Sequence, residues 1–172
     1  MMTNYSDDVS IEELINETIE TWSKERPDLD FSSMAASLKI GSVIRAIFDE
    51  ITDQFVDLGI NLGEFDVLAT LRRHGSGAKL TPKEIAEATF ITPSGLTNRL
   101  ARLEKAKLIS RYPDPKDGRG FLIKITAAGK RLVDRAIEIV VATEDRYMNE
   151  LSAAMKKGLD QSMNRLIKTL DN

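Results

Sequence analysis

Two Thr-Pro pairs that stand eleven residues apart limit what the middle of this chain can form. Thr81-Pro82 is followed by Glu84, and Thr92-Pro93 opens the next stretch. Threonine at an N-cap with proline at the first helical position is a strong signal for a helix start. The helix that starts at Thr81-Pro82 must therefore end near Thr89, before the second pair starts another helix. The sequence therefore predicts a short helix, a tight turn and a second helix that lasts to about Lys107.

Two segments with strand character follow this pair of helices. Residues 108–112 and 121–125 are rich in branched and aromatic residues, and residues 113–120 between them hold two Pro, two Gly and four charges. We expect two strands joined by a projecting loop, and a lone two-stranded ribbon must lean on helices to be stable. With a buried helix that starts near Asn61, the order is that of a winged helix-turn-helix. The predicted fold class is mainly α with a small β wing.

Amphipathic helices are expected on both sides of this module. Their start signals and apolar stripes predict helices at about residues 10–26, 33–57, 126–151 and 152–170. The stripes of the first and last helices have no obvious partner within one copy of the chain. We divide the chain into N-terminal helices at 1–60, the winged module at 61–126 and C-terminal helices at 127–172.

The net charge of -3 conceals an uneven distribution of charge. Residues 72–131 hold 14 Lys and Arg against 5 Asp and Glu, a net charge of +9, and the remainder of the chain carries -12. A concentrated basic module with acidic flanks is typical of a protein that binds a polyanion.

The helix that follows Thr92 has two distinct faces. Leu96, Leu100 and Leu103 cluster on one side and are expected to face the core, and polar or cationic side chains lie opposite. Asn can pair with adenine and Arg with guanine in the major groove, and a cation on the wing can enter the minor groove or hold phosphate. The predicted DNA contacts are Ser94, Thr97, Asn98, Arg102, Lys105, Lys116 and Arg119. We expect Asp117 to pair with Arg111 or Arg119 and fix the shape of the wing.

Composition excludes several other classes of function. The chain has no Cys and one His, so it forms no disulfide, no thiolate zinc site and no cysteine nucleophile. It has no signal-like segment and no apolar run of membrane length. We expect a cytoplasmic protein that is not an enzyme, with no metal, no cofactor and no membrane partner.

Four stretches resemble the MarR family of transcription regulators. They are residues 64–68 (EFDVL), the helix at 92–108, the wing Asp117–Gly120 and the segment Ile125–Gly129. The wing Asp-x-Arg followed by an apolar-Thr-x-x-Gly helix start is the most specific of these. The resemblance implies an obligate homodimer whose terminal helices interlock for dimerisation. It also implies that each winged lobe reads half of a pseudo-palindromic operator on double-stranded DNA, usually as a repressor.

The stretch at 22–30 (WSKERPDLD) resembles the extra N-terminal helix of the urate-responsive branch of that family. This resemblance implies a small-molecule effector bound by Trp22, Arg26, Asp66 and Arg99. The branch has a His early in the next helix, where this chain has Ser33, Met34 and Ser37, so we expect a related anionic aromatic ligand. We hypothesise that Asp66 and Arg99 pair and that the ligand captures Arg99. The alternative is a structural salt bridge beside a core Trp.

A second function remains open from the residues alone. The same fold could serve as a winged-helix protein-interaction module without DNA binding. The cationic face that includes Arg102, Lys105 and Lys116 argues against this alternative.

Overall fold

Short polar side chains begin most of the helices in the computed structural model, which describes residues 9–75, 77–89 and 95–170 without the side chain of Arg119. The hydroxyl or amide oxygen at each N-cap accepts a hydrogen bond from the backbone N–H three residues on. These caps are Ser10, Asn61, Thr81, Thr126 and Ser152. At Ser10, Asn61 and Thr81 a glutamate completes a capping box. The helix starts predicted at these five positions are confirmed.

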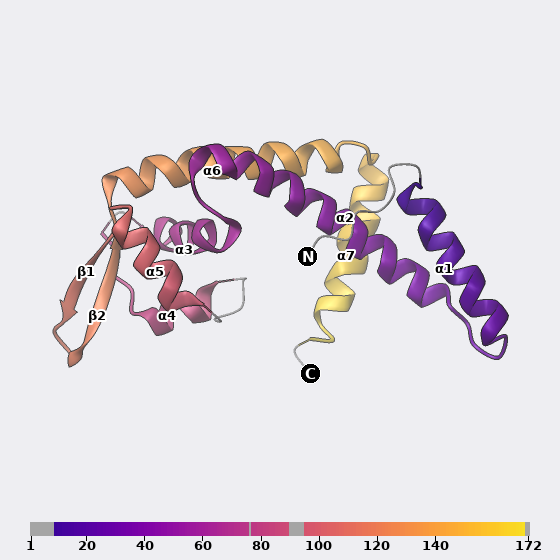
Figure 1. Cartoon of the computed structure of the whole chain (residues 1–172), viewed down its shortest axis with the longest axis horizontal. Coiled ribbons are helices and arrows are strands. Elements are labelled where there is room, and N and C mark those ends of the chain that lie inside the picture. Colours follow the sequence, from indigo (N-terminus) through magenta and orange to yellow (C-terminus); the bar gives the residue numbers. More distant parts are fainter. Residues whose placement is uncertain (1–8, 76, 90–94, 171–172) are drawn as a thin grey trace. The chain divides into compact units, whose positions relative to one another are not determined.

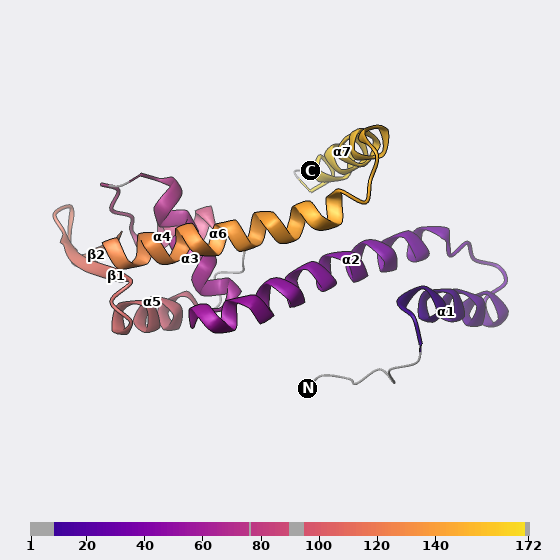
Figure 2. The same cartoon turned by 90° about the horizontal axis from the view of Figure 1, so that it is seen from above.

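The chain divides into two compact units, residues 1–49 and 50–172. In the first unit α1 (Ile11–Glu25) lies alongside the beginning of α2 (Ser32–Phe55), as Figure 2 shows. Ile15 is buried between these helices, and Pro27 follows the end of α1. In the second unit the end of α2 continues into a 3-10 turn, η1 (Val56–Leu58). Gly59 ends this turn at φ 68°, a left-handed conformation that favours glycine.

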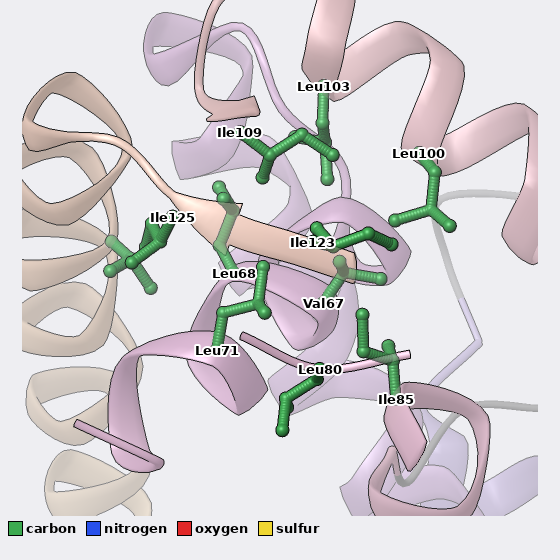
Figure 3. Packing of buried hydrophobic residues seen from close by; sticks show 11 residues of the cluster. Val67, Leu68, Leu71, Leu80, Ile85, Leu100, Leu103, Ile109, Ile123 and Ile125 are labelled. Atoms are coloured by element: carbon green, nitrogen blue, oxygen red, sulfur yellow. The ribbon is translucent and has the colours of Figure 1, made fainter. Parts of the chain in front are cut away.

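The second unit holds the winged module around one hydrophobic core. Its elements are α3 (Leu62–Arg73), α4 (Pro82–Ala88), α5 (Leu96–Lys105), β1 (Ile109–Asp114) and β2 (Asp117–Ile125) (Figure 1). Side chains from all of them meet in Figure 3. The buried core consists of Val67, Leu68, Leu71, Leu80, Ile85, Leu100, Leu103, Ile109, Ile123, Ile125 and Val133. The predicted fold class, mainly α with a small β wing, is confirmed.

The described part of α5 begins at Leu96, and Gly95 before it has φ 84°. The expected start at Thr92-Pro93 lies outside the described residues. At its other end, Leu108 N–H donates to the Leu103 carbonyl at 2.9 Å and Lys107 N–H donates to the Glu104 carbonyl at 2.8 Å. This Schellman turn holds Lys107 at φ 59°.

The wing is a longer hairpin than predicted. The strands occupy most of residues 113–120, which we expected to form a projecting loop, and only the turn between Asp114 and Asp117 remains. The register pairs Ile109 with Ile125 and shifts between Pro113 and Asp114. Pairing across the hairpin supplies hydrogen bonds that the local Pro and Gly content does not reveal. Leu80 adds a single bridge to Ile123, which ties the hairpin to the core.

A junction of three residues connects α5 and β1 to α6 (Ala127–Met148). The Leu108 carbonyl accepts hydrogen bonds from the backbone N–H and the hydroxyl of Thr126, each at 3.0 Å. Gly129 packs against the same carbonyl so closely that a Cβ at 129 would overlap it. From this junction α6 passes over α3 (Figure 1) and leads to α7 (Ala153–Ile167).

Apolar side chains remain exposed on the long helices of both units. None of the described helices has the length and apolar character needed to cross a membrane. In the first unit they are Ile11, Trp22, Met34, Leu38, Ile40, Val43, Ile44 and Phe48. In the second unit they are Ile137, Val141, Met155, Leu159, Leu166 and Ile167, and Leu170 is exposed just beyond the end of α7.

Candidate nucleic-acid interface

The outer face of α5 is polar and exposed, as its periodicity predicts. Leu100 and Leu103 are buried and Leu96 packs against the core, which fixes the rotation of the helix about its axis. The side chains on the other side are exposed, and we call them the reading face. The reading face consists of Thr97, Asn98, Ala101, Arg102 and Lys105. Ser94, also predicted as a contact, lies outside the described residues.

Arg102 forms an ion pair with a buried carboxylate of α3. Its Nε lies 2.9 Å from Oε1 of Glu64, whose side chain is 4% exposed while that of Arg102 is 66% exposed. The other oxygen of the same carboxylate, Oε2, accepts a hydrogen bond from the Asn61 N–H at 3.0 Å. Glu64 therefore serves two elements: it completes the cap of α3 and pairs with the reading face of α5.

A second ion pair joins α5 to the wing. Nε of Arg111 on β1 lies 2.8 Å from Oε2 of Glu104 on α5, and the guanidinium stacks over the ring of Phe121 at 4.5 Å. Arg111 was one of the two partners expected for Asp117, and its ion pair is with Glu104 instead. The pair fixes the base of the wing relative to the reading face.

The tip of the wing carries the predicted cation Lys116. Its side chain is exposed, and its backbone N–H donates to Oδ1 of Asp114 at 2.8 Å. Asp117 folds back over Gly120, where a Cβ would meet Oδ2 at 3.0 Å. This close approach explains glycine at 120. Arg119 lies on β2, and its side chain is outside the described part of the chain.

The segment before α4 lies against the wing, where Leu80 forms a bridge to Ile123. At the start of α4, hydrogen bonds from the backbone and hydroxyl of Thr81 lower the pKa of Glu84, and the positive charge of Lys116 lowers it further. Nearby, Nζ of Lys79 lies 4.3 Å from the centre of the Tyr112 ring on β1. Lys79 and Leu80 thus hold the segment before α4 against the wing.

Arg99 lies on the inner flank of α5, against α3. A Cβ on Gly63 would come within 2.8 Å of the Arg99 Cζ, so the guanidinium rests on a position that has no side chain. Asp66, one helical turn further along α3, is 8% exposed. Arg99 and Asp66 both make further interactions. The structure therefore packs the guanidinium of Arg99, a residue of α5, against Gly63 on α3, one turn before Asp66.

Trp22 and Arg26 belong to the first unit, at the end of α1. Trp22 is 48% exposed and stacks on Phe31, with ring centres 6.2 Å apart. Arg26 pairs with Asp28 through two hydrogen bonds, at 2.8 Å and 2.6 Å. Trp22 is therefore not a fully buried core residue, and an anion that binds Arg26 must compete with Asp28.

Sequence reasoning missed two residues that shape this interface. They are Glu64 and Glu104, and neither of them was assigned a role in DNA reading from the sequence. Their partners Arg102 and Arg111 are identified only once the helices and the wing are placed in three dimensions. For Glu104, the sole local signal is an acidic residue within an otherwise basic segment.

Known proteins resemble this chain over most of its length. The MarR-family model matches residues 58–120. The HTH-type transcriptional regulator PecS of Dickeya dadantii (strain 3937) is 35% identical over 161 residues, which cover 92% of this chain and 95% of PecS. The HTH-type transcriptional repressor MdtR of Bacillus subtilis (strain 168) is 30% identical over 67% of this chain and 72% of MdtR.

Solved structures show the same fold. The S. aureus MepR–DNA complex matches with a TM-score of 0.69 and 24% identity, over 77% of this chain and 96% of MepR. A mutant of E. coli MarR, complexed with operator DNA, matches with a TM-score of 0.65 and 22% identity, over 84% of this chain and 96% of that one.

Proposed function

Because the chain belongs to the MarR family and is a DNA-binding transcription regulator rather than an enzyme, we propose that it acts in the cytoplasm as a homodimeric repressor controlled by a small anionic aromatic ligand. The observation that carries the proposal is the exposed polar face of α5, backed by buried leucines and flanked by a cationic wing. Family membership also decides against the interaction module without DNA binding.

In the proposed complex α5 enters the major groove of an operator half-site. Asn98 and Arg102 read base edges, and Thr97 and Lys105 contact base edges or the phosphates beside them. Lys116 extends this surface on the wing, and Ser94 and Arg119 remain predicted contacts. Such a complex releases counterions, so its affinity falls steeply as salt concentration rises.

Selection from random-sequence DNA tests this proposal and identifies the operator in the same experiment. Wild-type protein is used to enrich duplexes, and the selected duplex is compared with a scrambled duplex of equal length over a range of salt concentrations. We expect enrichment of a sequence with two related half-sites and a linear fall of log affinity with log salt. Equal affinity for the selected and scrambled duplexes would refute sequence-specific reading.

The exposed apolar side chains of α2, α6 and α7 support a homodimer. Large contiguous apolar surface on a protein marks an interaction site, and a pseudo-palindromic operator requires two copies of the reading face related by a two-fold axis. We propose that a second copy covers these side chains.

The positions of Arg99 and Asp66 support a ligand switch. Arg99 rests on α3 beside the buried Asp66, and it also belongs to α5, so a ligand that captures its guanidinium pulls on the reading helix. Trp22 and Arg26 supply an aromatic surface and a second cation for an anionic aromatic ligand. We propose these four residues as the effector site.

The single Trp of the chain allows a direct test of this site. Titration with urate, and with xanthine as a less acidic analogue, is followed by the fluorescence of Trp22. Urate serves as a probe for anionic aromatic ligands, and we expect it to quench this fluorescence with an affinity that weakens in Arg99→Ala and in Arg26→Ala. Wild-type urate affinity in Arg99→Ala would remove Arg99 from the site.

A further inference from the structure

We propose that Glu64 is a positioning residue for DNA reading, because its buried carboxylate sets the orientation of the Arg102 guanidinium on the reading face. The inference deepens the proposed function and rests on it. It starts from the ion pair between α3 and α5, in which a side chain that is 4% exposed holds one that is 66% exposed.

The geometry of the pair leaves the useful edge of the arginine free. Oε1 of Glu64 lies 2.9 Å from Nε of Arg102, which is the guanidinium nitrogen nearest the helix. This ion pair uses Nε, and the side chain as a whole is 66% exposed. Guanidinium is planar, so a contact that fixes Nε also fixes the plane of the terminal nitrogens. A guanidinium held in this way is prepared for the bidentate contact that arginine makes with guanine.

Glu64 is itself held in place. Its other oxygen accepts the Asn61 N–H at 3.0 Å, and its own N–H donates to Oδ1 of Asn61 at 3.0 Å. A carboxylate fixed at both oxygens has little rotamer freedom. A surface partner such as Glu104, whose side chain is 42% exposed, cannot constrain an arginine to the same degree.

The charge of Glu64 also matters for selectivity. A free arginine on the reading face attracts phosphate on any sequence. A buried carboxylate at its Nε offsets part of this attraction, so the residue favours an aligned base contact over an arbitrary phosphate contact. Glu64 thus lowers the affinity for DNA of any sequence and increases the discrimination between the operator and other duplexes.

The test compares Glu64→Gln and Arg102→Lys, singly and together, on the wild-type-selected duplex and its scrambled form. Glutamine keeps an oxygen for the Asn61 N–H and removes the charge, and lysine keeps the charge and removes the planar fork. We expect each single variant to bind the selected duplex about tenfold more weakly. Affinity for the scrambled duplex should be unchanged or higher in Glu64→Gln. The double variant should lose no more than a single one, because both changes remove the same oriented group.

Asp134→Asn is the matched control. It breaks the Arg72–Asp134 pair, which also joins a carboxylate to an arginine between two helices of this unit, at 2.8 Å. We expect this variant to bind both duplexes as wild type does. Thermal unfolding of every variant shows that it is folded before binding is measured.

Three results would overturn the role of Glu64. The first is wild-type discrimination by Glu64→Gln. The second is an equal loss on both duplexes, and the third is losses that multiply in the double variant; either of these would mark a general structural effect. The proposed function fails by a different result, because wild-type protein that does not discriminate the selected duplex refutes sequence reading before any variant is made.

Discussion

Lys107 adopts a backbone conformation that L-residues with a side chain rarely take. It has φ 59° in the turn that ends α5 and begins β1, and it lies where a Schellman turn normally has glycine. The strain is held by the two hydrogen bonds that close the turn. This residue therefore stores a small destabilisation at the exit from the reading helix.

Lys107→Gly should raise the free energy of unfolding by about 1 kcal/mol, because glycine adopts positive φ without a Cβ clash. Denaturant unfolding measures the change. Lys107→Ala removes the same charge but keeps the strain, so it should leave stability close to wild type. Equal stabilisation by both variants would assign the effect to charge instead.

Asn98 is the residue on the reading face best suited to adenine. Its side chain is exposed, and Asn98→Ala should weaken binding to the selected duplex by about 1–3 kcal/mol while binding to scrambled DNA changes little. Fluorescence anisotropy with both duplexes measures the two affinities. Wild-type affinity of Asn98→Ala for the selected duplex would remove Asn98 from the base contacts.

Helix starts are the elements that local sequence predicts best in this chain. Each N-cap needs only information within four residues, so the starts of α1, α3, α4, α6 and α7 follow from the sequence. The start predicted for the next helix, at Thr92-Pro93, lies outside the described residues and stays a prediction. The wing depends on pairing across the hairpin, so residues 113–120 were wrongly expected to form a loop.

In the candidate site, too, local features were predictable from the sequence and contacts between elements were not. Helical periodicity predicted which side of α5 is exposed, because Leu100 and Leu103 must face the core. The supports of that face were not predictable, since the pair between Glu64 and Arg102 joins two helices far apart in the sequence. Periodicity describes one element, and an ion pair between elements requires the packed fold.

The capping box of α4 predicts a pH dependence of stability. Hydrogen bonds from Thr81 hold the pKa of Glu84 below its ordinary value of 4.5. A carboxylate whose pKa is lowered by folding stabilises the fold above that ordinary value, and this contribution disappears as pH falls through the folded-state pKa. Glu84→Gln should therefore unfold at a lower temperature than wild type near neutral pH, and the difference should shrink on acidification.

Glu87→Gln provides the control for this measurement. Glu87 lies on the same helix and has an exposed contact with Lys83 at 3.8 Å, so the same loss of charge should change the melting temperature less. A difference between wild type and Glu84→Gln that stays constant from about pH 7 to about pH 3 would contradict the cap as its origin.

At the scale of the whole molecule, the exposed apolar side chains of α7 are the clearest sign of a partner copy. Leu166 is 54% exposed, and Ile167 and Leu170 beside it are exposed as well. A helix with this surface is expected to pack against another chain. If the dimer presents two reading faces to one operator, dimerisation and operator affinity must fall together.

Leu166→Glu should shift the protein toward monomer and weaken operator binding by at least about tenfold, because a charge at a buried apolar contact is costly. Sedimentation velocity measures the assembly state. Gln161→Glu adds the same charge at another exposed position of α7 and should leave the dimer intact. Removal of residues 152–172 should have the stronger effect, and a stable, fully active dimer after that removal would refute dimerisation through α7.

The Leu108 carbonyl has a consequence for operator architecture. Two hydrogen bonds from Thr126 and the bare backbone at Gly129 lock the end of the reading helix onto the first turn of α6. In a two-fold assembly the separation of the two recognition helices must match the pitch of the double helix, about 34 Å for adjacent turns. In the proposed dimer, a rotation at this junction would therefore change the separation of the two recognition helices, and with it the spacing between half-sites that the protein could read.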